Sequence, residues 1–453
     1  MTTTMLFFDD ESLTCRDNVQ RKLGRARRLE PSVYHDPRGN CTWGYPAVFR
    51  DPTTGEWLLL YGVNFNPQWD AGGGSVALAT SRDGLQWQPA GVGPVCPATG
   101  GLFASAFEAN PAVPGLERFN LLYHAHPGGQ LWTSSDGQQW RLVEGAAWQE
   151  PNPDPPTFVH WNPRRQRYVL STRPDYCDRR IALFETTDFR SYTPLELALH
   201  TDSLDRSLTQ IYGMPIFFYD GWFIGLPWMF DISATETGSL PHKYRGGKQT
   251  AQVAYSLNGW HWQRSLREPL FPNGEPGEPD GGCLQPSSMI RLGDGTLRFY
   301  ASTSRHEHSH CPPDDGYIVS YELRRDGFVY LESDGGTGIV GTRPLFWLGG
   351  EVELNIQAPA GWVRVQVTDP RGQPLPGYTF SDSEVLHADR PAWTPTWKDG
   401  KTLAALADKM IRIEIQLENA RLYALRGDYV ECRLSDLIRL EKSGIRPTRE
   451  PRK

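Results

Sequence analysis

Short runs of alternating apolar and polar residues recur along the chain, and most of them end in a turn signal. One phrase repeats: a β-rich run, Ser or Thr, then Asp or Asn with Gly, two further residues and an aromatic. It occurs at 75–87, 130–140, 182–192 and 252–262. Asp-Gly and Asn-Gly between alternating strands are strong hairpin signals, so each copy predicts a β-hairpin.

The copies differ at the turn itself. Three copies have Gly after the Asp or Asn, whereas the third has Phe189 there, so we expect its turn to differ. A fifth, weaker copy lies at 319–331. The equivalent turn residues of the first four copies are Asp83, Asp136, Asp188 and Asn258.

A second predicted hairpin precedes each copy. Its first strands lie at 44–51, 105–110, 156–163, 212–220 and 286–294, and its returning strands at 56–62, 117–124, 166–173, 221–228 and 296–302. The pattern thus predicts five units of four strands. Such a unit cannot bury both faces alone, and stacking the units around an axis gives a β-propeller. A meander-rich sandwich that reuses one turn is the alternative.

The alternation changes after residue 325. Strict period-two runs at 351–356, 362–367 and 410–417 have one apolar and one charged face, which is typical of a separate β-sandwich. A short helix is expected at 402–409. The predicted fold class is all-β, a five-bladed β-propeller followed by a C-terminal β-sandwich. We expect an N-terminal segment, the propeller, the sandwich and a C-terminal tail at 1–30, 31–324, 325–426 and 427–453.

Composition agrees with a folded all-β protein. Of 453 residues, 39% are apolar, 22% charged and 12% aromatic, and 45 Gly and 37 Pro favour short strands and tight turns. The net charge of −7 argues against nucleic acid as a partner. No apolar run approaches the ~18 residues of a membrane span, so we expect no membrane partner.

Seven scattered cysteines with no CxxC pair indicate reduced thiols. The first residues lack the basic region of a secretory signal. We therefore expect a cytoplasmic protein. The sequence does not indicate its oligomeric state.

Several segments resemble a known group. Residues 6–13, 213–228, 278–303 and 324–333 are similar to bacterial proteins described as glycoside hydrolase family 32-like. A five-unit propeller followed by a sandwich resembles the five-bladed glycoside hydrolase superfamily, and its domain order is most similar to family 32, the invertase and levanase group. The resemblance implies a glycosidase that cleaves a fructosyl-type or arabinofuranosyl-type bond in a small carbohydrate, with no cofactor.

The short boxes that carry the family 32 chemistry do not transfer one for one. Residues 35–39 resemble the nucleophile box but lie farther from the next strand than that box would. Arg50, Asp51 and Pro52 match the second family motif, Arg-Asp-Pro, but fall at a predicted hairpin turn. The third family motif, Glu-Cys, has no counterpart in the propeller, since Glu431 and Cys432 lie in the C-terminal tail. A carbohydrate-binding propeller without turnover, or one recruited to a different biosynthetic reaction, therefore stays open.

Glycosidic hydrolysis needs two carboxyl groups that flank one bond. The resemblance implies a pocket lined by the starts of the innermost strands and by the loops after the second strands. Asp154 and Asp280 each stand just before an inner strand, although either could be a turn-forming Asp. Glu108 lies within its strand and Asp36 on the segment before Trp43. These four are the catalytic candidates.

Further polar and aromatic residues at the same positions are candidate sugar contacts. They are Trp43, Tyr45, His124, Arg173, Asp175, Gln210, Tyr212, Arg305 and His306. The aromatics could stack on a sugar ring or pack between blades. His306, His308 and His310 alternate, but three ligands on one short strand rarely converge on an ion, so we expect no metal site.

Overall fold

The computed structural model describes residues 2–38, 41–42, 44–51, 54–64, 75–91, 102–111, 113–125, 128–146, 154–174, 178–233, 246–308, 312 and 314–449. Almost all regular structure in this part of the chain is β-strand. The chain divides into two compact units, one of Arg25–Arg324 and one of Met1–Gly24 with Arg325–Lys453. Each unit is described by itself below.

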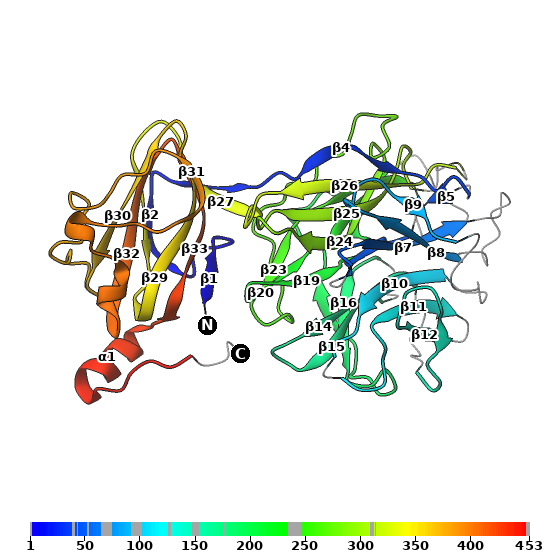
Figure 1. Cartoon of the computed structure of the whole chain (residues 1–453), viewed down its shortest axis with the longest axis horizontal. Helices are drawn as coiled ribbons and strands as arrows, with labels where there is room; N and C mark the ends of the chain where they lie inside the picture. Colours follow the sequence, from blue (N-terminus) through cyan, green and yellow to red (C-terminus); the bar gives the residue numbers. More distant parts are fainter. Residues whose placement is uncertain are drawn as a thin grey trace. The chain divides into compact units, whose positions relative to one another are not determined.

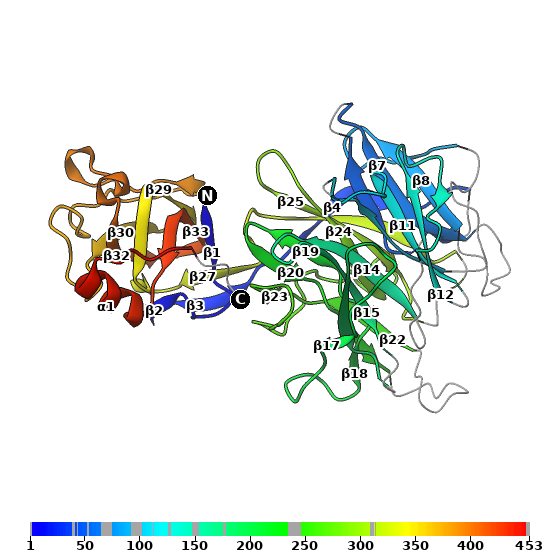
Figure 2. The same ribbon diagram turned by 90° about the horizontal axis from the view of Figure 1, so that it is seen from below.

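The first unit is a propeller-like arrangement of small antiparallel sheets (Figures 1 and 2). Two sheets have the predicted four consecutive strands each. They are β10 (Leu102–Glu108), β11 (Phe119–Ala125), β12 (Gly128–Ser134) and β13 (Arg141–Leu142), then β14 (Asp154–Asn162), β15 (Arg167–Arg173), β16 (Ile181–Thr186) and β17 (Glu196–Leu199). An earlier sheet contains β5 (Cys41–Thr42), β6 (Ala47–Arg50), β7 (Trp57–Asn64), β8 (Ser75–Ser81) and β9 (Gln88–Pro89).

The predicted fourth and fifth units are not separate sheets. A three-stranded sheet holds β19 (Ile216–Tyr219), β20 (Trp222–Gly225) and β23 (Ala254–Ser256). A seven-stranded sheet runs in the order β18 (Thr209–Ile211), β21 (Trp228–Ile232), β22 (Gly247–Ala251), β24 (Cys283–Arg291), β25 (Leu297–Ser304), β26 (Tyr317–Leu323) and β4 (Arg27–Tyr34). The parallel contact of β22 with β24 joins the strands of the predicted fourth unit to those of the predicted fifth unit. Five separate blades are therefore not observed.

The repeated turn is present in all four copies. In the first, the amides of Leu85 and Gln86 donate to Asp83 Oδ1 at 2.8 and 2.9 Å, and Gly84 N donates to Ser81 Oγ at 3.0 Å. The other copies make the same bonds. These bonds lower the pKa of the carboxyl groups at Asp136 and Asp188.

The expectation that the third turn would differ is wrong. Phe189 adopts a φ of 57°, close to the 70° of Gly84, and donates its amide to Thr186 Oγ1 at 2.8 Å. Its ring is buried against Phe107 and Tyr168. Burial of a large aromatic ring offsets the strain of the left-handed backbone.

The weak fifth copy is not a hairpin of the propeller. Asp326 also has a positive φ of 62°, but it is buried and ion-paired with Arg426, and Asn355 Nδ2 donates to it at 2.9 Å. The strands on either side, β26 and β27, belong to different sheets. This segment therefore begins the second unit.

The second unit has ten connected strands around a common apolar core. The predicted period-two runs lie in β29 (Leu345–Gln357), β30 (Trp362–Thr368) and β32 (Lys409–Glu418). Its other strands are β27 (Val329–Ser333), β28 (Gly338–Thr342), β31 (Asp389–Trp393) and β33 (Ala420–Glu431). The strand β32 pairs with β28 and β30 on opposite edges, and it also pairs with β29. Short 3-10 helices occupy Lys398–Gly400 and Leu403–Leu406, and α1 spans Leu434–Ser443.

The N-terminal residues do not form a segment of their own. The strands β1 (Thr3–Leu6), β2 (Leu13–Asp17) and β3 (Gln20–Leu23) pair with β33, β28 and β27, and so complete the sheet of the second unit. The next strand, β4, instead forms the edge of the seven-stranded sheet beside β26. Within the described residues, no helix is long and apolar enough to cross a membrane.

Candidate functional site

Polar and aromatic side chains meet where the first strand of a sheet begins and the second strand ends. The Arg173 guanidinium lies 4.2 Å from the centre of the Tyr212 ring, and that of Arg179 lies 5.5 Å from it. Arg179 Nη1 also donates to Gln210 Oε1 at 3.0 Å. Tyr212 Oη and His308 Nε2 are 3.0 Å apart. We call these five residues the Arg-Tyr cluster.

The cluster brings together three of the predicted sugar contacts, Arg173, Gln210 and Tyr212. Arg173 ends β15 and is only 3% exposed, so its guanidinium is held against the ring in a water-poor environment. Cation–π attraction strengthens when the cation is desolvated. The cluster therefore presents fixed donors of the kind that bind sugar hydroxyls or carboxylates.

Sequence reasoning missed two members of the cluster, Arg179 and His308. Arg179 lies in the loop between β15 and β16, so the rule that loops after second strands line the site could have found it, as it found Asp175 in the same loop. His308 belongs to the alternating histidines, whose spacing was noted only for a metal. In the structure, His306 instead pairs with Asp315, while His308 meets Tyr212.

Asp154 is the predicted carboxylate that lies at this end of the sheet. It begins β14, and its Cα is the register partner of Arg173. Its side chain, like that of His124, lies outside the described part of the chain. Trp43 and Asp175 also lie outside the described residues.

Asp36 is fully buried in an ion pair. Arg38 Nη2 donates to its Oδ2 at 2.9 Å, Arg38 Nε to its Oδ1 at 3.0 Å, and Tyr61 Oη to its Oδ2 at 2.5 Å. Burial alone would raise the pKa of Asp36, but these hydrogen bonds outweigh it and hold the pKa below its ordinary value. Asp36 is thus an ionised group bonded to Arg38 and Tyr61, and its predicted catalytic role stays a prediction.

Asp280 is buried in the same manner. Arg28 Nη1 on β4 donates to its Oδ1 at 2.8 Å, and the Tyr321 hydroxyl on β26 donates to its Oδ2. Burial and the nearby Asp280 raise the pKa of Tyr321. Asp280 is thus bonded to two strands at one side of its sheet, and its predicted catalytic role stays a prediction.

Glu108 lies at the wrong end of its strand for the predicted site. It ends β10, about 20 Å along the strand from Leu102, at about 3.3 Å per residue. Its side chain is 45% exposed and accepts a hydrogen bond from Arg118 Nε at 2.7 Å. Direction along the strand, rather than side-chain parity, separates Glu108 from the other candidates.

Tyr45 packs against protein. Its ring stacks on Trp228 at 5.5 Å between centroids and lies edge-on to Phe158 at 5.7 Å. Trp228 Nε1 in turn donates to the carbonyl of Pro286 at 3.1 Å. Because both stacked rings are buried, the packing alternative applies to Tyr45 and the sugar-stacking prediction does not.

Arg305 and His306 lie on a loop fixed by a carboxylate that the sequence reasoning did not single out. The buried Asp315 accepts hydrogen bonds from Arg305 N at 2.9 Å, from His306 N at 3.0 Å and from His306 Nδ1 at 2.7 Å. Arg305 lies 4.8 Å from the Tyr317 ring centre. The structure places this loop beside Gly282, at the start of β24.

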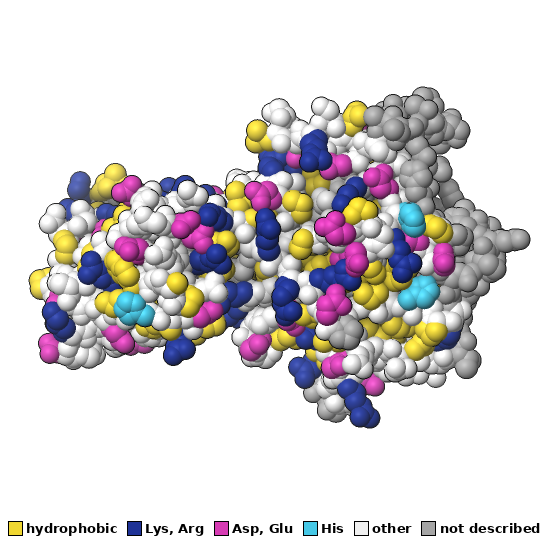
Figure 3. Space-filling model, turned by 90° about the horizontal axis from the view of Figure 1, so that it is seen from above, with side chains coloured by type: hydrophobic (Ala, Val, Ile, Leu, Met, Phe, Trp, Pro, Cys, Tyr) yellow, Lys and Arg dark blue, Asp and Glu magenta, His cyan; other side chains and the backbone are white. Residues whose placement is uncertain are grey.

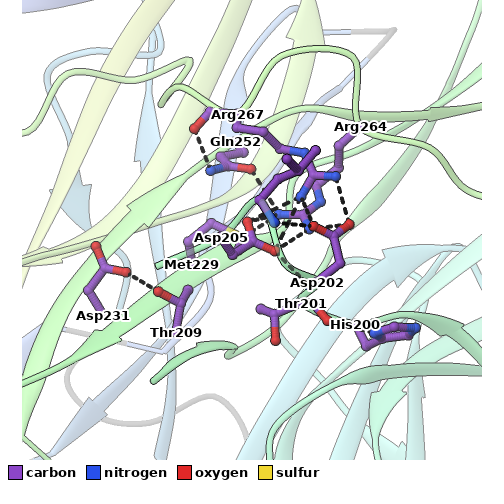
Figure 4. Close-up of polar contacts among 11 residues, drawn as sticks. His200, Thr201, Asp202, Asp205, Thr209, Met229, Asp231, Gln252, Arg264 and Arg267 are labelled. Carbon is purple, nitrogen blue, oxygen red and sulfur yellow. Dashed lines mark hydrogen bonds and ion pairs between the residues drawn. The ribbon is translucent and has the colours of Figure 1, made fainter. Parts of the chain in front are cut away.

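A second polar network, drawn in Figure 4, is made by residues other than those of the Arg-Tyr cluster. Arg264, which is almost fully buried, donates to both oxygens of Asp205 at 2.7 and 2.6 Å and to Gln252 Oε1 at 3.2 Å. Arg267 Nη2 donates to Asp202 Oδ2 at 2.7 Å, and this bond is the main cause that lowers the pKa of Asp202 to about 2. The network ties the connection before β18 to the segment after β22.

The described residues contain no group of three or more His, Cys, Asp or Glu arranged to hold a metal ion. On the face drawn in Figure 3, Lys and Arg side chains are interspersed with Asp and Glu. That face therefore has no continuous basic surface of the kind that nucleic acid requires.

No protein-family model and no curated protein matches the chain. Among solved structures, the chain is similar to an N-acetylgalactosamine deacetylase from F. plautii in complex with blood group B trisaccharide. The identity is 14%, the TM-score 0.46, and the match covers 67% of this chain and 95% of that one. It is similar to a β-1,2-mannobiose phosphorylase from Listeria innocua at 14% identity and a TM-score of 0.45, over 65% and 96% of the two chains.

The chain is also similar to an α-L-arabinofuranosidase from Podospora anserina, at 13% identity and a TM-score of 0.44, over 66% and 97% of the chains.

Proposed function

We propose that this protein is a glycosidase that binds a small carbohydrate at the Arg-Tyr cluster. The observation that carries the proposal is that Arg173, Gln210 and Tyr212 converge at the end of the sheet where β14 begins. Asp154 is the first residue of that strand. Guanidinium, amide and phenol groups are among the polar groups that bind sugar hydroxyls, and glycosidic cleavage also requires carboxyl groups at the site.

In this proposal Asp154 acts as one of the two reacting carboxyl groups. Asp36 and Asp280 are already bonded to an arginine and a tyrosine each, so they keep structural roles. The substrate class, a fructosyl-type or arabinofuranosyl-type furanoside, rests on the resemblance of 213–228 and 278–303 to family 32-like proteins, and so does the assignment to that family.

The test compares two carboxylates at opposite ends of neighbouring inner strands. The unmodified protein, Asp154→Asn and Glu108→Gln are assayed on nitrophenyl α-L-arabinofuranoside and on sucrose. Loss of a positioned acid or base lowers kcat by roughly 10²–10⁴-fold, so Asp154→Asn should lose hydrolysis. Glu108→Gln should keep it. Full activity of Asp154→Asn would remove Asp154 from the mechanism.

Carbohydrate binding without turnover is the second candidate. Its support is that two predicted catalytic acids, Asp36 and Asp280, are withdrawn into ion pairs. Calorimetry that shows saturable sugar binding, together with no product after long incubation, would favour this function over hydrolysis.

A further inference from the structure

Four neighbouring strands of the seven-stranded sheet place one residue each in a single row. The row is Gln210, Phe230, Gln249 and Cys283. Directly paired residues on neighbouring strands point to the same face of a sheet. The four side chains therefore share a face.

That face is the one that carries the Arg-Tyr cluster. The Phe230 ring centre lies 5.1 Å from the Arg179 guanidinium, 5.4 Å from the His308 ring and 5.7 Å from the Tyr212 ring. Since Gln249 is the register partner of Phe230, its amide lies on the side of the sheet where the cluster lies.

A second glutamine joins Gln249 there. Gln285 follows Cys283 by two positions on β24, so it points to the same face, and its Nε2 donates to Gln249 Oε1 at 2.5 Å. Gln249 is fully buried, whereas Gln285 is 8% exposed. Of the two residues, only Gln285 keeps any exposure to solvent.

Gln249 has a donor that the protein does not satisfy. Its Nε2 is buried and has no hydrogen-bond partner among the described residues. Burying an amide donor without an acceptor is unfavourable, so such groups are uncommon unless they serve a function. This glutamine pair therefore needs an explanation besides packing.

We propose that Gln285 contacts the sugar in this site and that a hydroxyl group of the same sugar accepts the hydrogen bond for which Gln249 Nε2 has no acceptor among the described residues. This inference rests on the proposed function. The occupant is a neutral sugar with a hydroxyl group directed at the glutamine pair. An amide offers both a donor and an acceptor without charge, and a hydroxyl group offers the same pair of roles, so the two match.

The experiment measures D-fructose and L-arabinose binding by calorimetry to the full chain and to Gln285→Met, Gln249→Met and Gln252→Met. Gln252 is a matched control: it is also a buried glutamine, but its amide bonds Arg264 and the Arg267 carbonyl in the other network (Figure 4). We expect Gln285→Met and Gln249→Met to raise Kd at least tenfold. Gln252→Met should lower the thermal midpoint and leave Kd unchanged.

A purely structural role is separated by monodeoxy derivatives of whichever sugar binds. At least one derivative should bind the unmodified protein more weakly than its parent sugar, and Gln285→Met should no longer distinguish the two. If Gln285→Met binds both sugars as tightly as the unmodified protein, this inference fails while the proposed function stands. If the unmodified protein binds neither sugar, both fail.

Discussion

His160 is a half-buried histidine whose ring nitrogens are both buried and whose ring lies beside Phe223 on the neighbouring sheet, with 6.1 Å between ring centres. Neither ring nitrogen has a hydrogen-bond partner among the described residues. Burial lowers the pKa of His160 to about 3, from an ordinary value of 6.5. The imidazole is therefore neutral in the folded protein throughout the physiological range.

This residue should make the protein sensitive to acid. Below pH 6.5 the unfolded chain binds a proton at His160, while the folded chain does not until pH nears 3. The free energy of unfolding should therefore decrease as the pH is lowered from 6.5 toward 3. At pH 5 this residue alone should account for a loss of about 2 kcal/mol. Urea unfolding of His160→Leu and of the unmodified protein, measured at pH 7.5, 6 and 5, checks this.

The difference between the two proteins isolates the histidine, because the other titrating groups are shared. At pH 5 the stability of His160→Leu should fall short of that of the unmodified protein by less than at pH 7.5, or should exceed it. Parallel pH profiles for the two proteins would contradict the prediction.

Residue positions were predicted better than residue partners. The rule that inner strand starts line the site selected Asp154, Gln210 and Tyr212, because strand boundaries follow from local alternation. The same rule selected Asp280, whose partners Arg28 and Tyr321 lie on strands far away in the chain. A sequence pattern carries no signal for such partners, so burial of the carboxylate could not be foreseen.

At the scale of elements, the repeated turn was predicted because its bonds are local. The Ser or Thr hydroxyl and the Asp or Asn side chain bond amides two or three residues away, so the sequence alone specifies them. The third turn was predicted wrongly because Phe189 is held by tertiary packing. The fusion of the fourth and fifth units depends on the β22–β24 contact, which is likewise not local.

Two glycines of this turn should respond differently to the same substitution. Gly84 and Gly137 have φ of 70° and 74°, so an alanine costs about 1–2 kcal/mol of backbone strain at either position. A Cβ at Gly84 would lie 2.7 Å from the Tyr300 hydroxyl and 2.9 Å from the Trp57 ring, whereas at Gly137 the nearest atom is 3.7 Å away. Overpacking adds about 1–3 kcal/mol, so Gly84→Ala should destabilise more.

Urea unfolding followed by tryptophan fluorescence measures the two variants side by side. The Gly137→Ala variant serves as the control, because it has the strain without the clash. Equal losses of stability in the two variants would show that the contacts around Gly84 relax at no cost.

At the scale of the whole molecule, strands from the first 24 residues complete the sheet of the second unit. β1, β2 and β3 pair with strands more than 300 residues later, and Met5, Phe7 and Leu13 lie in that unit's apolar core. Alternation within 325–426 predicted a separate β unit, but the sequence carries no signal for pairing across such a distance. The N-terminal strands were therefore assigned to a segment of their own.

Removal of residues 1–24 should damage the second unit selectively. The deletion leaves the pairing edges of β27, β28 and β33 open and exposes apolar core residues that Met5 and Phe7 cover. Open edges and lost burial both reduce local stability. Hydrogen exchange should therefore accelerate in 329–333, 338–342 and 420–431, while β14 and β15 of the propeller-like unit keep their protection.

Mass spectrometry of peptides from both units measures both results in one experiment, with the peptides of β14 and β15 as the internal control. Unchanged exchange in 420–431, or equal acceleration in β14 and β15, would mean that the first 24 residues do not belong to the cooperative core of the second unit.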